Sequence, residues 1–225
     1  MYEKGEGVEK DPFRALLMYE QAADAGNADA MCHFGRCWEV GVGVPIDYVR
    51  ALRYYNKAAE EHNHGEANYR LGLCYHNGVG VYKDMSQAIE HYRRGADQGY
   101  VEAQYNLGLC FMKGVGVEQD YGRAVELYQL AADQNHALAQ VNLGACYQLG
   151  QGVDKDLSHA ARLYTRAVSC DANCKIAKYN LALCYLKGKG VDKDVSRGIE
   201  LLRAASEKGH KPSIAKLSRL HPTRT

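Results

Sequence analysis

One seven-residue pattern, Gly-x-Gly-Val-x-x-Asp, occurs six times in the 225 residues and constrains the fold more than any other feature. Its copies begin at Gly5, Gly41, Gly78, Gly114, Gly150 and Gly188. The six closing aspartates are separated by 36, 37, 36, 36 and 38 residues. So constant a period is typical of proteins in which one supersecondary unit is stacked many times.

Small and aromatic residues follow each aspartate at fixed intervals. Alanine stands four residues on and tyrosine eight residues on in five of the copies, and mostly small residues stand eleven and twelve residues on. These intervals lie on one face of an α-helix. The aspartate suits the N-cap position, where its carboxylate accepts a backbone N–H. We therefore expect an amphipathic helix, here called helix A, after each aspartate.

A second apolar stripe precedes the next copy of the pattern. In one repeat it consists of Ala103, Tyr105, Leu107-Gly108 and Cys110-Phe111. This stripe predicts a helix B that ends at the first glycine of the pattern, because glycine tolerates the left-handed C-cap conformation. The valine of the turn is expected to be a buried peg. The extra residues of the longer units fall between the helices, in 62–64 and 169–173, where an insertion leaves both helices intact.

The whole chain, 1–225, is predicted to be one repeat domain. Residues 1–10 are expected to be the end of a truncated repeat, beginning in the last turn of a helix B. Five repeats follow at 11–46, 47–83, 84–119, 120–155 and 156–193, and 194–225 is expected to be a C-terminal capping repeat.

The repeat resembles the Sel-one-like repeat, a tetratricopeptide-like α/α family. The matching positions of one copy are Ala103, Leu107-Gly108, Phe111, Gly114, Gly116-Val117, Asp120, Ala124, Tyr128 and Ala131-Ala132. The resemblance covers essentially the whole chain. It implies an all-α, right-handed superhelical solenoid of about six helix pairs, which acts as a scaffold or adaptor that binds proteins.

Charge and hydropathy exclude several classes of partner. Lys and Arg number 28 and Asp and Glu 27, so the formal net charge is +1. A chain this close to neutral has no global attraction for nucleic acid. No stretch approaches the roughly 20 apolar residues that span a bilayer. We therefore expect neither a nucleic-acid partner nor membrane insertion.

Five of the eight cysteines occupy one repeat position: Cys37, Cys74, Cys110, Cys146 and Cys184. Equivalent atoms on neighbouring helices lie about 8–10 Å apart, too far for a ladder of disulfides. We expect buried, reduced thiols, which fit a cytoplasmic, reducing compartment. Cys170 and Cys174 lie in an inserted loop, where they could be ordinary residues, a local disulfide or part of a metal site that lacks a second ligand pair.

No motif predicts catalysis. The Gly-x-Gly runs lack the third glycine and the lysine of nucleotide-binding loops. No Ser/His/Asp set or paired carboxylates appear in a catalytic context. His62 and His64 are interpreted as a solvated surface pair. We expect no enzyme activity, cofactor or metal.

The outward positions of helix A carry a local excess of basic residues. At three, six and ten residues after the aspartate, the candidate binding residues are Arg14, Arg50, Arg53, Lys57, Arg94, Arg123, Arg162, Arg166 and Arg197. Helix A lines the concave face of helix-pair solenoids, so this face is predicted to bind an acidic or carboxylate-terminated protein segment. The competing interpretation is a solvated face with glutamate partners one turn away. Two further functions fit the same repeat pattern: self-assembly into a homo-oligomer, and regulation as one domain of a larger protein.

Overall fold

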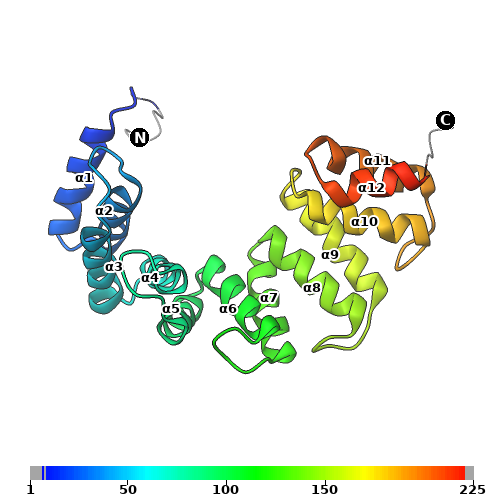
Figure 1. The fold of residues 1–225 in the computed structure, drawn as a ribbon, viewed down its shortest axis with the longest axis horizontal. Coiled ribbons are helices and arrows are strands. Elements are labelled where there is room, and N and C mark those ends of the chain that lie inside the picture. Colours follow the sequence, from blue (N-terminus) through cyan, green and yellow to red (C-terminus); the bar gives the residue numbers. More distant parts are fainter. Residues whose placement is uncertain (1–6, 8, 221–225) are drawn as a thin grey trace. The chain divides into compact units, whose positions relative to one another are not determined.

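The computed structural model describes residue 7 and residues 9–220, and this part of the chain contains twelve α-helices and no strand (Figure 1). Type A and type B helices alternate, so the predicted all-α array of six helix pairs is confirmed. The A helices are α1 (Pro12–Asp24), α3 (Tyr48–His62), α5 (Met85–Asp97), α7 (Tyr121–Asp133), α9 (Leu157–Cys170) and α11 (Val195–Glu207). The B helices are α2 (Ala28–Val40), α4 (Gly65–Asn77), α6 (Val101–Lys113), α8 (Ala137–Leu149), α10 (Lys175–Lys187) and α12 (Lys211–Leu220).

The array divides into two compact units, with the boundary in the last turn of α6. The first unit extends to Cys110 and includes residues 115–118, and the second comprises residues 111–114 and the chain from Gln119 onward. The expected truncated helix at the N-terminus falls on residues 1–6 and 8, outside the described residues.

Each A helix begins directly after one of the repeated aspartates, which is its N-cap. In α9, the Oδ1 of Asp156 accepts a hydrogen bond from the backbone N–H of His159 at 2.8 Å. This bond favours the charged carboxylate and is the largest cause of the lowered pKa of Asp156. The predicted helix start is therefore confirmed, because the cap gives a partner to an N–H that the helix cannot satisfy.

The turn between a B helix and the next A helix is closed at both ends. Gly41 ends α2 in the left-handed conformation, with φ 78°, and its N–H donates to the Cys37 carbonyl at 2.9 Å. The backbone N–H of Asp47 then donates to the Trp38 carbonyl at 2.9 Å. The same closure recurs from Asp84 to Tyr75, Asp120 to Phe111, Asp156 to Tyr147 and Asp194 to Tyr185.

The valine of this turn is less buried than expected. Val44, Val81 and Val191 are half-buried and pack at the edges of the hydrophobic clusters rather than inside them. The turn lies at the end of a helix pair, where one side of the valine faces solvent. The prediction of a buried peg is therefore wrong in degree, because these valines are only half-buried.

In α3, α5 and α9 a tyrosine inserts against a glycine of the preceding B helix. Tyr55, Tyr92 and Tyr164 are almost fully buried, and their rings lie over Gly35, Gly72 and Gly144. A Cβ at any of these glycines would stand within 2.5–2.8 Å of a ring carbon. In the last pair Ala182 replaces the glycine and Leu202 replaces the tyrosine. The most extensive helix contacts accordingly join a B helix to the A helix that follows it: α2 with α3, α4 with α5, α8 with α9, and α10 with α11.

Candidate functional site

Three of the arginines that stand three residues after an N-cap aspartate, Arg50, Arg123 and Arg197, contact an aromatic residue of the preceding B helix. The guanidinium of Arg50 lies 4.4 Å from the centre of the Trp38 ring, and its Nε lies 3.3 Å from Asp47 Oδ2. Arg123 likewise lies over Phe111 at 5.5 Å and pairs with Asp120 at 3.4 Å. A guanidinium held over an aromatic ring is attracted by the negative face of that ring. These side chains brace the turn, so their charge is only partly available to a partner.

An equivalent contact occurs before α9 and α11, where the aromatic residue is a tyrosine and, in α9, a histidine replaces the arginine. The guanidinium of Arg197 lies 4.7 Å from the Tyr185 ring centre. His159 takes the position of the arginine in α9, and its ring centre lies 4.2 Å from that of Tyr147. A cation or an imidazole on the aromatic residue of the preceding B helix is thus a structural element of this repeat.

The candidate basic residues farther along α5 and α9 contact their neighbours. Arg94 pairs with Glu90 at 3.0 Å, one turn away, as the solvated-face interpretation predicts. Arg166 spans two repeats: it lies 3.5 Å from the Asp133 carboxylate and donates to Asn135 Oδ1 at 3.1 Å. Arg162 is exposed and contacts the His159 ring at 3.1 Å. The ion pairs of Arg94 and Arg166 weaken their claim to a binding role.

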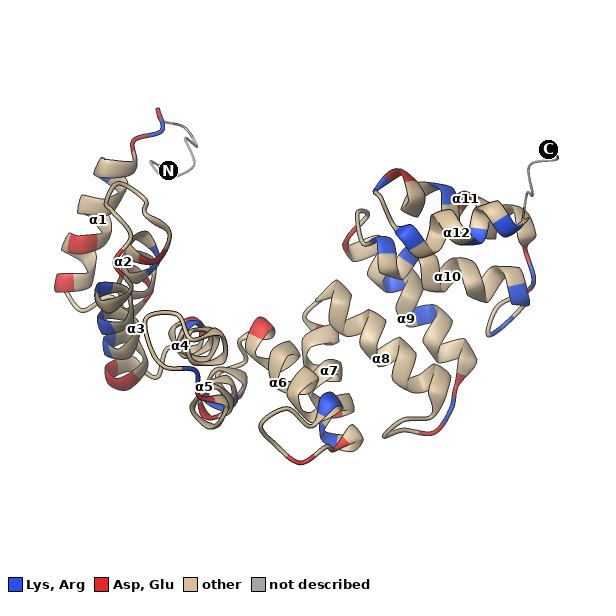
Figure 2. Ribbon diagram, viewed as in Figure 1, with Lys and Arg blue, Asp and Glu red and all other residues tan. Residues whose placement is uncertain are grey.

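Arg53 and Lys57 differ from these residues because neither forms an ion pair with any described residue. Both project from α3, one turn apart, beside Arg50, and Figure 2 shows this concentration of basic positions on α3. Arg14 on α1 is exposed, and its backbone N–H donates to Asp11. In the first unit the structure therefore brings Arg50, Arg53 and Lys57 together.

The cysteines are placed as packing residues. Cys37, Cys74, Cys110, Cys146 and Cys184 are all buried, which confirms the prediction for this repeat position. Burial raises the pKa of Cys74 to about 12 and that of Cys146 to about 11, so these thiols are neutral and poor nucleophiles. Cys170 is exposed at the end of α9, and Cys174 is buried at the N-cap of α10. All eight cysteines are free thiols.

Two histidines have structural roles that the sequence pattern does not predict. The expected solvated state of His64 is wrong, because its Nδ1 accepts the backbone N–H of Ala67 at 3.2 Å and thereby caps α4. Its Nε2 hydrogen-bonds to Asp29 at 2.9 Å. His136 caps α8 in the same way through Ala139 at 3.1 Å. A positional signal for this role exists in the sequence, since both histidines stand where Asn27 caps α2.

The buried tyrosine hydroxyls take different partners in different repeats. Tyr55 donates to Glu39 at 2.5 Å, and Glu39 also lies 3.7 Å from Arg70. The equivalent hydroxyls of Tyr92 and Tyr164 bond to His76 at 3.2 Å and to Gln148 at 3.3 Å. Glu66 completes the first of these networks by accepting two bonds from Arg70, at 3.1 and 3.2 Å. These polar groups thus satisfy one another across neighbouring helices.

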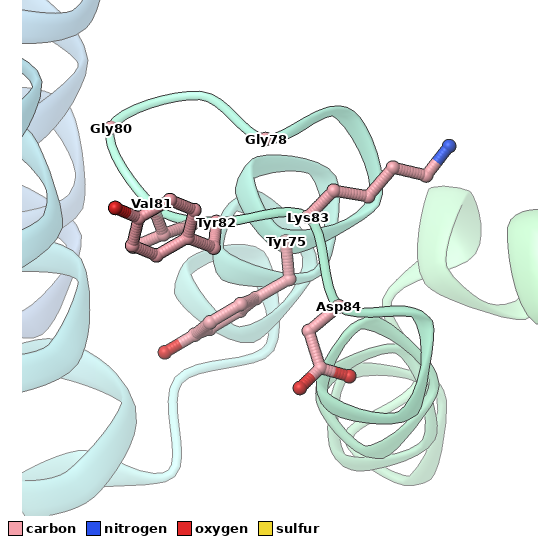
Figure 3. A pocket seen from close by; sticks show the side chains of 7 residues that line it. All are labelled: Tyr75, Gly78, Gly80, Val81, Tyr82, Lys83 and Asp84. Carbon is pink, nitrogen blue, oxygen red and sulfur yellow. The ribbon is translucent and has the colours of Figure 1, made fainter.

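A solvent-open pocket of about 820 Å³ lies against the turn between α4 and α5. In Figure 3 the ring of Tyr75, from the last turn of α4, and the ring of Tyr82, from the connecting turn, point the same way, whereas Lys83 extends in the opposite direction. Tyr82 is 96% exposed. Tyr75 stacks on His91 with 5.5 Å between ring centres, and Asp84 caps α5. The lining therefore offers aromatic contact area but no catalytic arrangement.

Metal-binding clusters and membrane-spanning helices are both missing from residues 7 and 9–220. No three His, Cys, Asp or Glu side chains lie close enough together in this part of the chain to hold a metal ion. None of its twelve helices combines the length and the apolar character that crossing a membrane requires.

Comparison with known protein families identifies the repeat. The model of the Sel1 repeat matches residues 1–27, 28–63, 65–100, 101–136, 137–171 and 175–210. Its frame runs from a B helix to the end of the next A helix, so it divides the period at a different point from the repeats that begin at Asp11. That frame encloses the tyrosine–glycine contact within one repeat.

Two solved structures share the fold over most of the chain. A Sel1 repeat protein from Oxalobacter formigenes is 34% identical with a TM-score of 0.84, and the match covers 92% of this chain and 84% of that one. A protective antigen of uropathogenic Escherichia coli is 27% identical with a TM-score of 0.86, and the match covers 100% of this chain and 47% of that one.

A curated relative matches a shorter stretch. The ERAD-associated E3 ubiquitin-protein ligase component HRD3B of Arabidopsis thaliana is 41% identical over 59 residues, which are 26% of this chain and 10% of that protein. The chain thus spans about a tenth of the plant relative and about half of the E. coli antigen.

Proposed function

This chain belongs to the Sel1 repeat family, and from that premise we propose that it is a non-enzymatic scaffold that binds acidic protein segments on the exposed faces of its A helices. The Sel1 repeat is generally a protein-interaction fold without catalytic activity. The plant relative is named as a component of a ubiquitin ligase, which is consistent with a role inside a protein assembly.

The chemistry of the described residues supports a binding role over catalysis. The repeated aspartates are occupied as helix caps, and His64 and His136 are occupied in the same way. The repeat-position thiols are buried. What remains for function is a solvated surface of repeated helix faces, which suits an extended or helical peptide better than a small substrate.

One observation carries the choice of an acidic partner: Arg53 and Lys57 are two neighbouring cations without an ion pair among the described residues. Two unpaired charges of one sign on adjacent turns repel each other, and a carboxylate between them would remove that repulsion. Arginine adds geometric selectivity because its planar fork donates two hydrogen bonds to one carboxylate. Arg162 on α9 is a third such cation and lies in the other unit.

The test is a selection of displayed random 12-residue peptides on the purified full chain. We expect the enriched peptides to carry an excess of Asp and Glu, and the triple variant R53E/K57E/R162E to lose them while its thermal unfolding stays unchanged. These side chains are preferable to Arg50, whose reversal would also remove the stacking on Trp38. Failure to enrich any peptide, or enrichment of basic ones, would refute the proposal.

A further inference from the structure

The exposed stripe of each A helix lies at two, six and ten residues after the N-cap aspartate. These intervals of four place the three side chains one above another on one helix face. In the first unit the stripes are Phe13-Leu17-Gln21 on α1, Val49-Arg53-Lys57 on α3 and Ser86-Glu90-Arg94 on α5. The three repeats thus present one apolar stripe, one mixed stripe and one polar stripe.

Large apolar side chains are exposed on the first two of these stripes. Phe13 is 68% exposed, Leu17 55% and Val49 74%. The first position of the stripe is serine or glycine in the four later repeats, and the second position is charged in all five repeats after the first. The fold therefore does not require apolar residues here, and neighbouring exposed apolar residues mark a binding surface in a soluble chain.

Helices α1 and α3 share two hydrophobic clusters. Leu16 and Tyr19 of α1 share a hydrophobic cluster with Tyr54 of α3. Farther along α1, Ala23 shares a second cluster with Ala51. Residues of α2 complete both clusters, so α1 and α3 pack against the same B helix and their outward stripes lie on successive A helices.

The charges around this surface leave its basic residues without partners. Burial and, to a smaller extent, the carboxylates of Asp24 and Glu20 on α1 raise the pKa of Tyr54. Neither carboxylate forms an ion pair with Arg53 or Lys57. Glu90, the acid on the next A helix, is taken up by Arg93 at 3.5 Å and Arg94 at 3.0 Å. The face therefore offers two cations beside an apolar strip.

We propose that Phe13, Leu17, Val49, Arg53 and Lys57, here called the apolar–basic face, bind one acidic peptide segment that also carries large apolar side chains. The apolar side chains of the segment cover Phe13, Leu17 and Val49, and its carboxylates contact Arg53 and Lys57. Burying apolar area supplies most of the affinity, while the charges set orientation and association rate. The inference rests on the proposed function and narrows it to one surface and one class of ligand.

The decisive variants use residues that the chain itself carries at the same positions in other repeats. F13S reproduces Ser86, L17E and R53E reproduce Glu90, and K57A reproduces Ala204. None of the four replaced side chains is buried, so the variants are expected to fold, which circular dichroism and thermal unfolding verify. The matched control is L130A on α7, an exposed leucine at the third stripe position of the other unit.

The probes are fluorescein-labelled copies of the 12-residue peptides that the wild-type chain enriches from the random library. We expect these peptides to combine at least two carboxylates with at least two large apolar residues. Fluorescence anisotropy should show at least tenfold weaker binding to F13S/L17E and to R53E/K57A, and unchanged binding to L130A. Raised salt should weaken binding to the wild type more than binding to R53E/K57A.

The remaining outcomes separate this inference from the proposed function. Acidic peptides that bind both double variants as tightly as the wild type would overturn the inference and leave the proposed function standing. Failure to enrich any peptide would overturn both. Binding to phosphatidylserine vesicles that F13S/L17E abolishes would assign the face to a lipid surface and overturn the inference. If F13S/L17E fails to fold, F13S alone replaces it, because that change removes one exposed side chain without adding a charge.

Discussion

The contact between Gly144 of α8 and Tyr164 of α9 predicts how one methyl group disturbs the repeat. A Cβ on residue 144 would stand 2.7 Å from Tyr164 Cε1, about 0.7 Å inside the 3.4 Å at which ordinary contact begins. The ring has nowhere to move, because Tyr164 is almost fully buried and its hydroxyl bonds to Gln148. Close-packed interiors transmit such strain rather than absorb it.

Two opposing effects determine how much G144A changes the free energy of unfolding. Forcing a methyl group into a packed core costs about 1–3 kcal/mol. Replacing glycine by alanine inside a helix contributes up to about 1 kcal/mol in the other direction. We therefore expect a net loss of about 1–2 kcal/mol in the free energy of unfolding. G122A is the matched control, because a Cβ there would meet only a carboxylate oxygen of Asp120, at 3.3 Å. That change should not destabilise the chain.

The double variant G144A/Y164L tests the mechanism. It recreates the pair that the chain uses in its last repeat, Ala182 with Leu202. Y164L alone leaves a cavity and should cost about 2–4 kcal/mol. In the double variant the methyl group occupies space that the ring has vacated, so its own cost should disappear. We expect a favourable coupling of about 1 kcal/mol or more.

Urea unfolding followed by circular dichroism measures the cycle, and amide hydrogen exchange localises the change to α8 and α9. Losses that add to within about 0.5 kcal/mol would refute the steric reasoning, because independent sites are additive at that level. A gain of stability in G144A would refute it directly.

A helix cap, an exposed thiol and two histidines give three further predictions. Replacing Asp84 with alanine removes the acceptor of two backbone N–H bonds at the start of α5 and should cost about 1 kcal/mol, whereas asparagine should retain most of the stability; urea unfolding of the pair checks this. A thiol reagent should label Cys170 rapidly in the native chain and the seven buried cysteines only on unfolding, so C170S should lose the fast phase. Burial lowers the pKa of His91 and that of His210 below the ordinary 6.5, so the unfolded chain binds more protons near pH 6; stability should be highest above pH 6.5 and fall as the pH drops toward the lowered values, and H91L should show a smaller fall.

The helices could be predicted because residues close to each helix end determine where that helix begins and ends. An aspartate caps a helix through an N–H two or three residues away, and a glycine ends one within the last turn. Such interactions need no knowledge of the rest of the molecule. Because these signals recur at a nearly constant period, together they predicted the six helix pairs and the buried cysteine position.

The candidate site could be predicted only in part, because the state of a surface side chain depends on residues from other helices. Arg50 and Arg53 look equivalent in sequence, but Arg50 lies over Trp38 of the preceding helix, while Arg53 has no ion-pair partner among the described residues. His64 looks solvated in sequence, although it caps α4.

The period, the alternation of helices and the residues that face the core all follow from spacing along the chain, so the amino-acid sequence is enough to establish them. The absence of a side chain at Gly144 is explained only by the folded array, since the atoms that exclude one come from the next helix. The same is true of the basic residues that stay unpaired and of the apolar stripe that lies beside them. These properties depend on the distance between helices, and the spacing of residues along one helix does not determine that distance.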